Sequence, residues 1–312
     1  FANKLWNASR FVIMNLQDEE GNKLPMNSDM GALRDEDKWI ISRVNETAKY
    51  VENAMDKFEL SMAAQKVYDL IWNEYCDWYI EIVKGRLYGD DEEDKKTARF
   101  VLVKALGDML KMLHPFMPFI TEEIWSYLPK EKDGFIMLES FPEYNSAYEF
   151  AKETAELELT MEAVKAIRNI RAEADAAPSK TLTAVIIAEG NELEAVKECE
   201  RYICQMANIS EILFTEDKSA VPAEAMSAVI NGAEIHIPLE ELVDFKAEAE
   251  RLAKEKKRLE GEVARGEKML SNPGFVNKAP EKKINEEKEK LANYRDMLEK
   301  VTERLAAVEK KI

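Results

Sequence analysis

The sequence predicts a mainly α-helical protein in three parts: a helical bundle, a small α/β domain and a C-terminal antiparallel coiled-coil hairpin. Apolar residues recur at helical spacing through most of the chain. One interval is instead rich in β-branched residues and carries a hairpin signal. Heptad repeats fill the C-terminal part. A length of 312 residues allows two or three domains, and we expect them at residues 1–147, 148–241 and 242–312.

The bundle is predicted from three segments in which apolar residues return every three or four positions. They are DKWIISRVNETAKYVENAMDKF, AQKVYDLIWNEYCDWYIEIV and KTARFVLVKALGDMLKMLH. Turn residues and charges separate them in GNKLPMNSDMG and LYGDDEED. Pro115 and Pro118 follow His114. Because a helix does not run through prolines at this spacing, one helix should end here and another begin.

The predicted α/β domain begins with a long helix, AELELTMEAVKAIRNIRAEA, which is closed by APSK. The β-branched run TLTAVIIA then predicts a strand, ELEAVKECERYICQMA a helix, and SEILFT a further strand. The pair Asn231-Gly232 lies between two alternating runs, AMSAVI and AEIHIPL. This pair predicts a hairpin with a type I′ turn.

The last part contains two heptad arms. The second arm repeats apolar residues every seven positions at two seam positions: Ile284, Leu291, Leu298, Leu305 and Ile312, with Tyr294, Val301 and Val308. The first arm carries Phe245, Leu252 and Leu259, with Ala249, Val263 and Leu270 on the neighbouring seam position. The break SNPGFVNKAP should fold the arms into an antiparallel hairpin about 40 Å long, with the break near its far end.

Charge is unevenly distributed along the chain. The formal net charge is −17, which argues against a simple nucleic-acid binder. Residues 246–312, however, carry +4, and the remainder carries −21. No window of eighteen apolar residues and no signal-like start occur, so we expect no membrane span and no secretory signal. The first residue is Phe1, inside a helical pattern, which suggests a piece of a longer chain.

A search for catalytic motifs finds none. The two histidines, His114 and His236, are far apart, and no phosphate-binding glycine loop or G-x-S-x-G elbow is present. Cys76, Cys199 and Cys204 match no disulfide framework or zinc ribbon, so reduced thiols of a cytosolic protein are expected. We expect no catalytic residue and no metal site. His114 is interpreted as a structural cap.

The first predicted helix has two different faces. Lys4, Asn7 and Phe11 share one face, with Arg10 at its margin, and such a set can bind a nucleotide by stacking and phosphate contacts. Leu5, Val12 and Leu16 form an apolar face that should pack on the bundle. In the alternative, Phe11 joins Trp6 and Ile13 in the core, and the pattern alone favours this alternative.

The basic residues of the tail also have two interpretations. Mixed charges of this kind usually keep a coiled coil in solution. The basic bias near the break favours contact with a nucleic-acid backbone instead. The candidate residues are Lys254, Lys257, Arg258, Arg265, Lys268, Lys278, Lys282 and Lys283. Phe275, Val276 and Pro280 are expected to stabilise the turn, with Phe275 inward rather than stacked on a nucleotide.

Five segments together resemble one family: FANKLWNASRFVIMNL, IWNEYCDWYIEIVKGRLY, LHPFMPFITEEIW, AIRNIRAEADAAPSKTL and NPGFVNKAP. They are similar to the C-terminal third of bacterial valyl-tRNA synthetases, and the resemblance covers essentially the whole chain. LHPFMPFITEEIW is less specific, because it is similar in the isoleucyl and leucyl enzymes. One departure is Ala177, where relatives often have proline, and no functional consequence is expected.

The resemblance implies an anticodon-binding bundle, a small α/β junction and a coiled-coil arm that packs on the tRNA elbow. It places Lys4, Arg10 and Phe11 at the anticodon loop, with the ring of Phe11 on an anticodon base, and so reverses the preference for a core role. Asn7, which shares their face of the helix, completes the candidate anticodon-binding set. The implied partner is the tRNA for valine, and the implied parent is a monomeric cytoplasmic class I ligase that uses ATP and Mg²⁺. The H-x-G-H and K-M-S-K-S motifs and the editing domain are absent from this sequence, so we expect the fragment not to catalyse.

A second hypothesis is a structural helical scaffold whose coiled coil binds a protein partner. The acidic body and the mixed charges of the tail favour it, while the proline-glycine break favours a hairpin formed within one chain. An independent enzyme is a third hypothesis, which the missing motifs disfavour.

Overall fold

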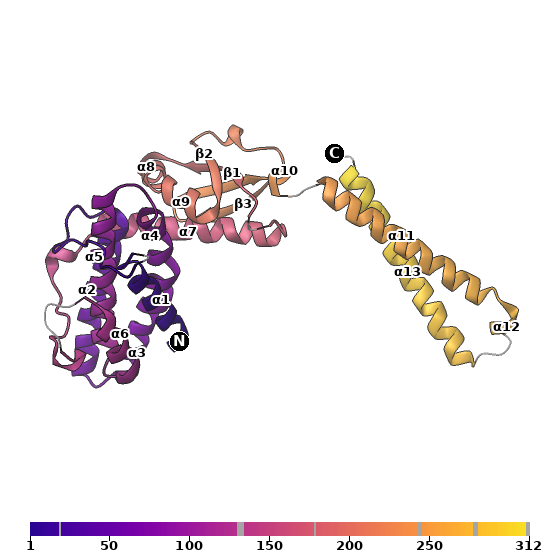
Figure 1. Ribbon diagram of the computed structural model, residues 1–312. Coiled ribbons are helices and arrows are strands. Elements are labelled where there is room, and N and C mark those ends of the chain that lie inside the picture. The colour runs from indigo at the N-terminus through magenta and orange to yellow at the C-terminus, as the bar shows by residue number, and fades with distance from the viewer. Residues whose placement is uncertain (19, 130–133, 178, 243–244, 277–279, 310–312) are drawn as a thin grey trace.

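The computed structural model contains a helical bundle, a sheet-containing domain and a long helical hairpin, in that order along the chain (Figure 1). It describes residues 1–18, 20–129, 134–177, 179–242, 245–276 and 280–309. The predicted mainly α-helical class is confirmed. The domain boundaries at 147/148 and 241/242 stay predictions.

The bundle is built from helices whose apolar faces meet in one core. Trp39, Tyr75 and Tyr79 are among its largest fully buried side chains. One helix ends at Leu113 and the next begins at Pro118, as the two prolines predicted. The elements are α1 (Ala2–Met14), α2 (Asp35–Asp56), α3 (Leu60–Asp69), η1 (Leu70–Tyr79), α4 (Ile80–Leu87), α5 (Glu92–Leu113) and α6 (Pro118–Tyr127).

The segment predicted as one helix over residues 64–83 is interrupted by η1, a ten-residue π-helix. The apolar pattern did not distinguish the two forms, because both bury one face. A π-helix has i→i+5 hydrogen bonds, and such turns are rare and frequent at functional sites. Tyr75 and Tyr79 of this element lie side by side in the core, with ring centres 5.9 Å apart.

Residues 134–150, which we call the strap, precede α7 (Ala151–Glu173) and contain two short 3₁₀ turns, η2 (Ile136–Leu138) and η3 (Ser146–Tyr148). The side chain of Asn45 on α2 holds the strap. Its amide donates to the carbonyl oxygen of Asn145 over 3.0 Å, and its oxygen accepts from the Asn145 amide over 2.7 Å. These two hydrogen bonds fix the position of the strap on α2 shortly before α7 begins.

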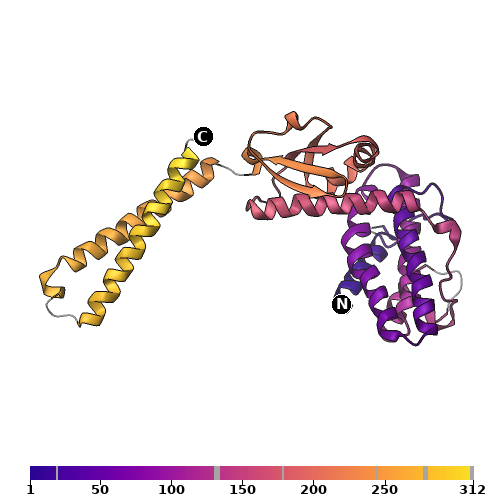
Figure 2. The same cartoon turned by 180° about the vertical axis from the view of Figure 1, so that it is seen from behind.

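The α/β domain is a four-stranded sheet in the order β2-β1-β4-β3. Strands β1 and β2 are parallel, and the other neighbours are antiparallel. Helix α7 runs along the sheet and also packs on α2 of the bundle (Figure 2). The elements are β1 (Leu182–Ala188), α8 (Gly190–Glu198), α9 (Glu200–Ala207), β2 (Ile209–Thr215), η4 (Lys218–Ala220), β3 (Ala225–Ile230), β4 (Ala233–Pro238) and α10 (Leu239–Leu242).

Two local predictions in this domain are wrong. The helix expected over residues 192–207 is broken at Cys199, whose buried thiol contacts the carbonyl oxygen of Glu156 on α7 at 3.1 Å. The hairpin at Asn231-Gly232 forms, but only Gly232 has a positive φ, of 74°, so the turn is not type I′. In this turn the backbone amide of Asn231 donates to the carboxylate of Glu162 on α7 over 3.2 Å.

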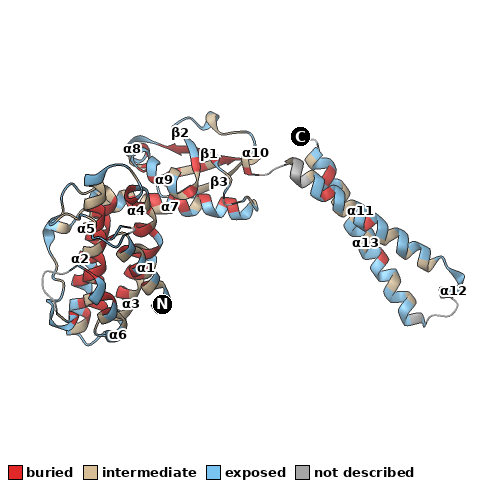
Figure 3. Cartoon of the chain, in the orientation of Figure 1, coloured by how far each residue is buried: buried red, intermediate tan, exposed pale blue. Residues whose placement is uncertain are grey.

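The hairpin consists of α11 (Phe245–Leu270), α12 (Pro273–Val276) and α13 (Glu281–Glu309). Leu252 and Leu259 of α11 and Leu291 and Leu305 of α13 are buried, and Figure 3 shows buried segments on both of these neighbouring helices. Gly266 lies against the side chain of Leu291. The other predicted seam residues in the described part are half-buried, and Ile312 lies outside it. Along the described residues, no helix combines the length and the apolar character that a membrane crossing requires.

Candidate nucleic-acid interface

Helix α1 has the two faces that the sequence predicted. Leu5, Val12 and Leu16 are buried in the bundle core. Asn7 and Arg10 are exposed. The contrast arises because residues three, four and seven apart share one side of a helix. The exposed side of α1 is therefore available for binding.

Lys4 lies at the edge of this face and is anchored to η1. Its Nζ atom lies 2.5 Å from Asp77 Oδ1, 3.3 Å from the carbonyl oxygen of Trp72 and 3.9 Å from the centre of the Trp72 ring. Asp77 and Trp72 are about seventy residues away in the sequence, so helical spacing in α1 did not indicate them. The carboxylate of Asp77 compensates the charge of Lys4, which reduces its attraction for phosphate.

An aromatic stack supports the start of α1. The ring centres of Phe1 and Tyr68 are 4.9 Å apart, and those of Tyr68 and Trp72 are 5.7 Å apart with planes at 9°. Offset stacks of this kind add to the energy gained by burying the rings. The stack holds Trp72 beneath Lys4 and ties α1 to the π-helix.

Phe11 is half-buried and packs against the edge of the core. The Nζ atom of Lys84 on α4 lies 5.7 Å from the centre of its ring, and the same ammonium pairs with Glu81. Phe11 is thus neither fully buried nor fully exposed, so both alternatives stay open. Lys84 was not singled out in the sequence, since its place beside Phe11 depends on the packing of α4 on α1.

A buried ionic cluster joins the bundle to the α/β domain. The guanidinium of Arg86 lies 2.7 Å from Asp37 Oδ2 and 3.1 Å from Glu36 Oε1, and all three residues are buried. Asp94 also pairs with Arg86. From the other domain, Tyr202 donates to Glu36 over 2.6 Å. A buried charge is costly unless it is paired and hydrogen-bonded, and each member here has partners.

Burial in this cluster raises the pKa of the Asp37 carboxyl above its usual value, although the neighbouring Arg86 acts in the opposite direction. The pKa of the Tyr79 hydroxyl, which donates to Asp37 over 2.8 Å, is also raised well above its usual value by burial. The partners come from α2, η1, α4, α5 and α9. The cluster is therefore structural, and it fixes how α9 sits against the bundle.

Arg171 gives the segment RNIRAE its structural role. Its buried guanidinium donates to the carbonyl oxygens of Lys180 at 2.6 Å, Ala207 at 2.9 Å and Asn208 at 2.8 Å. These carbonyls close the loops before β1 and after α9. The group also reaches the backbone oxygen of Ala177 at 3.5 Å. Because this contact uses only the backbone oxygen of Ala177, it does not depend on the side chain at that position.

The described candidate cations of the hairpin are exposed: Lys254, Lys257, Arg258, Arg265, Lys268, Lys282 and Lys283. Arg258 pairs with Glu255 and Arg265 with Glu262 on the same helix. Lys278 lies outside the described residues, and so do the side chains of Phe275 and Val276. The hairpin therefore displays cations to solvent, with two of them partly neutralised by neighbouring glutamates.

Each of the two histidines has a side-chain neighbour in the structure. His114 Nδ1 lies 2.7 Å from Thr121 Oγ1, across the break between α5 and α6, which agrees with a capping role. His236 lies beside Glu234 on β4. Within the described residues, no group of three or more His, Cys, Asp or Glu side chains is placed to hold a metal ion.

Two of the three thiols are buried. Burial raises the pKa of both Cys76 and Cys199 to about 11, so little reactive thiolate forms at pH 8. We expect the half-buried Cys204 to react first and the other two to react slowly with a disulfide reagent at pH 8 in native protein. Absorbance of the released thiol measures the rates, and addition of denaturant should make all three react rapidly. Rapid reaction of three thiols without denaturant would contradict the buried placement.

Comparison with known proteins shows which families the chain resembles. Residues 37–187 match the anticodon-binding domain of tRNA ligases, and residues 244–309 match the valyl-tRNA synthetase tRNA-binding arm. Curated valine–tRNA ligases are similar over nearly the whole chain. That of Clostridium acetobutylicum is 44% identical over 310 residues, which is 99% of this chain and 34% of the relative.

Two further valine–tRNA ligases show the same extent of similarity. The protein of Clostridium tetani is 45% identical over 308 residues, or 99% of this chain and 34% of the relative. That of Bacillus subtilis is 38% identical over 307 residues, or 98% of this chain and 34% of the relative. The chain thus spans about a third of the length of the curated relatives that it matches.

Proposed function

This chain is homologous over almost its whole length to valine–tRNA ligases, and we propose that it forms the tRNA-recognition part of such an enzyme. The whole enzyme would attach valine to its tRNA using ATP and Mg²⁺. In this proposal the 312 residues bind the RNA and carry no part of the chemistry. The protein would act in the cytoplasm, as a monomer.

The observation that carries the proposal is the exposed face of α1. Asn7 and Arg10 are exposed there, and the ring of Phe11 is half-buried beside them. A ring stacks on an unpaired base, an amide can bind a base edge and a guanidinium can bind phosphate. These are the groups needed to bind an RNA loop. Lys4, which pairs with Asp77, would help to position α1 and contribute less to the charge.

The hairpin would supply affinity that does not depend on sequence. Its cations are exposed on a structure whose leucine seam is already filled by α11 and α13. Contacts to phosphate position an RNA without reading it. The scaffold hypothesis requires a seam that is open to a protein partner, and the internal pairing of the two helices leaves it less support.

Phe11→Ala tests whether the ring of Phe11 recognises the anticodon. Stacking of a base on an aromatic ring contributes about 1–3 kcal/mol, so we expect roughly tenfold weaker binding of a transcript with a valine anticodon. The affinity for a transcript with an altered anticodon should fall much less, because that transcript lacks the base that would stack on Phe11. Filter binding measures both. Ile13→Ala, which shortens another half-buried side chain of α1, is the matched control and should affect the two transcripts alike. Equal losses for both transcripts with Phe11→Ala would refute the readout role.

A further inference from the structure

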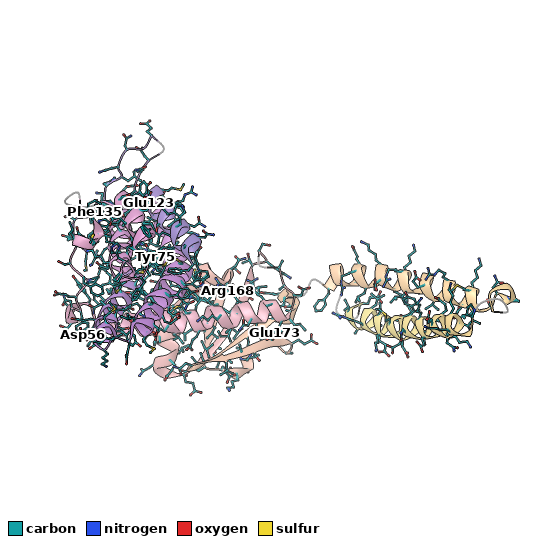
Figure 4. All side chains as sticks on the ribbon, turned by 90° about the horizontal axis from the view of Figure 1, so that it is seen from below. Asp56, Tyr75, Glu123, Phe135, Arg168 and Glu173 are labelled. Atoms are coloured by element: carbon teal, nitrogen blue, oxygen red, sulfur yellow. The ribbon has the colours of Figure 1, made fainter. Side chains whose placement is uncertain are left out.

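Helix α7 presents two exposed cations close to the bundle. The Nζ atom of Lys165 lies 5.8 Å from the centre of the Trp78 ring, and the guanidinium carbon of Arg168 lies 5.7 Å from it. Asn169 is exposed next to them. Arg168 is found where the bundle meets the α/β domain (Figure 4). We call Lys165, Arg168 and Asn169 the α7 surface.

The position of Arg168 is fixed from the α/β side. Its Nη2 atom donates to the carbonyl oxygen of Met206, at the end of α9, over 2.8 Å. The neighbouring Gln205 donates to the carbonyl oxygens of Glu81 and Ile82 over 3.3 Å and 3.2 Å. A guanidinium held by one N–H group keeps its other donors in a defined direction, which lowers the entropy lost when it binds an anion.

The α7 surface is linked to the α1 face by direct contacts. The ammonium of Lys84 on α4 lies over the ring of Phe11, 5.7 Å from its centre. The next residue, Gly85, lies against the side chain of Gln205 on α9. Met206 follows and accepts from Arg168. The proposed readout residue and the α7 surface therefore lie on neighbouring elements, with α4 and α9 between them.

Within the described part of the chain, the charges of Lys165 and Arg168 are not compensated by a carboxylate. Among the residues that the structure describes, no carboxylate forms an ion pair with either of them, whereas Lys197 pairs with Glu194 and Lys218 with Glu234. The part of the chain before residue 246 carries −21. Two unpaired cations, one helical turn apart and held over the same ring, suit two neighbouring phosphates of a nucleic acid.

We propose that the α7 surface binds the phosphate backbone of the tRNA stem adjoining the loop that α1 reads. This inference rests on the proposed function. Phosphate binding here would add affinity without selecting a sequence, because backbone contacts carry no base information. The competing explanation is that the two cations only cover Trp78, which would make them structural.

The test is the double substitution Lys165→Ala/Arg168→Ala in the full chain. Binding is measured over a series of salt concentrations, with a transcript carrying a valine anticodon and one with that anticodon altered. We expect on the order of tenfold weaker binding of both transcripts, and a slope of log K against log[salt] that is shallower by about 2, or one for each lost contact. The control Lys197→Ala/Lys218→Ala removes the same charge from the same domain and should leave the slope unchanged.

The outcomes separate the two proposals. If the unaltered chain binds neither transcript, the proposed function fails. If it binds and distinguishes the transcripts, but the double variant has the slope of the control, the inference about α7 fails. A structural role would lower the melting temperature in circular dichroism and leave the slope unchanged. Should the double variant unfold, Lys165→Ala alone is expected to reduce the slope by about 1, and an unreduced slope would overturn the inference.

Discussion

Arg86→Met is expected to lower the free energy of unfolding by about 3–5 kcal/mol, because it leaves the buried Asp37 without its cation and leaves Glu36 with Arg201 alone. Glu36 and Asp37 are both buried, and the Arg86 guanidinium lies 3.1 Å and 2.7 Å from them. Methionine fills much of the same volume, so the loss would come from charge and hydrogen bonds rather than from a cavity. Urea unfolding at pH 7, monitored by circular dichroism, measures the free energy of unfolding of the variant and of the unaltered protein.

The defect of Arg86→Met should depend on pH. In the unaltered protein burial raises the pKa of Asp37, and Arg86 opposes the rise. Without Arg86, the folded state holds a proton on Asp37 to higher pH than the unfolded chain does. The folded state then binds more protons, so the stability of the variant falls as pH rises. We expect a smaller defect at pH 5 than at pH 8.

An exposed ion pair provides the control for Arg86. Lys197→Met removes the partner of Glu194 at the surface, and such pairs contribute only about 0–1 kcal/mol. A loss below about 1 kcal/mol for Arg86→Met would show that the buried cluster tolerates removal of its cation. A defect that grows on acidification would contradict the role assigned to Asp37.

Removal of residues 244–312 is expected to weaken binding of every tRNA transcript by about tenfold to a hundredfold and to flatten the salt dependence. Deletion takes away the mildly basic part and leaves a strongly acidic body. The loss should be the same for valine and altered anticodons, because the arm would contact backbone only. Filter binding over a salt series measures both quantities.

A charge-substituted arm complements the deletion. Lys254, Lys257 and Arg258 are exposed, so changing all three to Gln keeps the hairpin and should reduce the salt slope partly. Circular dichroism checks that the helices remain. An unchanged slope after deletion of the whole arm would exclude contact between arm and RNA.

Much of the fold could be read from local patterns. The heptads at Leu252, Leu259, Leu291 and Leu305 predicted which side chains meet, and these four are buried. The spacing of apolar residues in the first helix likewise predicted its inner face. Periodicity works here because each element buries one face, and the period of the burial follows from the geometry of the helix.

The candidate site was predictable only in part. Sequence placed Lys4 on the outer face of α1, but its contacts with Asp77 and Trp72 depend on how η1 turns beside it. Lys84 reaches Phe11 from another helix. Arg168 was visible only as part of a family segment. Contacts between distant segments leave no periodic signal, so spacing along one helix does not reveal them.

The sequence by itself determined the class of fold, the inner and outer faces of α1 and the hairpin of heptad arms, because these follow from local propensity and the burial of one face. Only the tertiary structure decided the π-helix, the break at Cys199 and the cluster around Arg86. Cys199 and Arg86 both contact partners that lie more than forty residues away in the sequence. Packing and desolvation act between such partners only after the chain has folded.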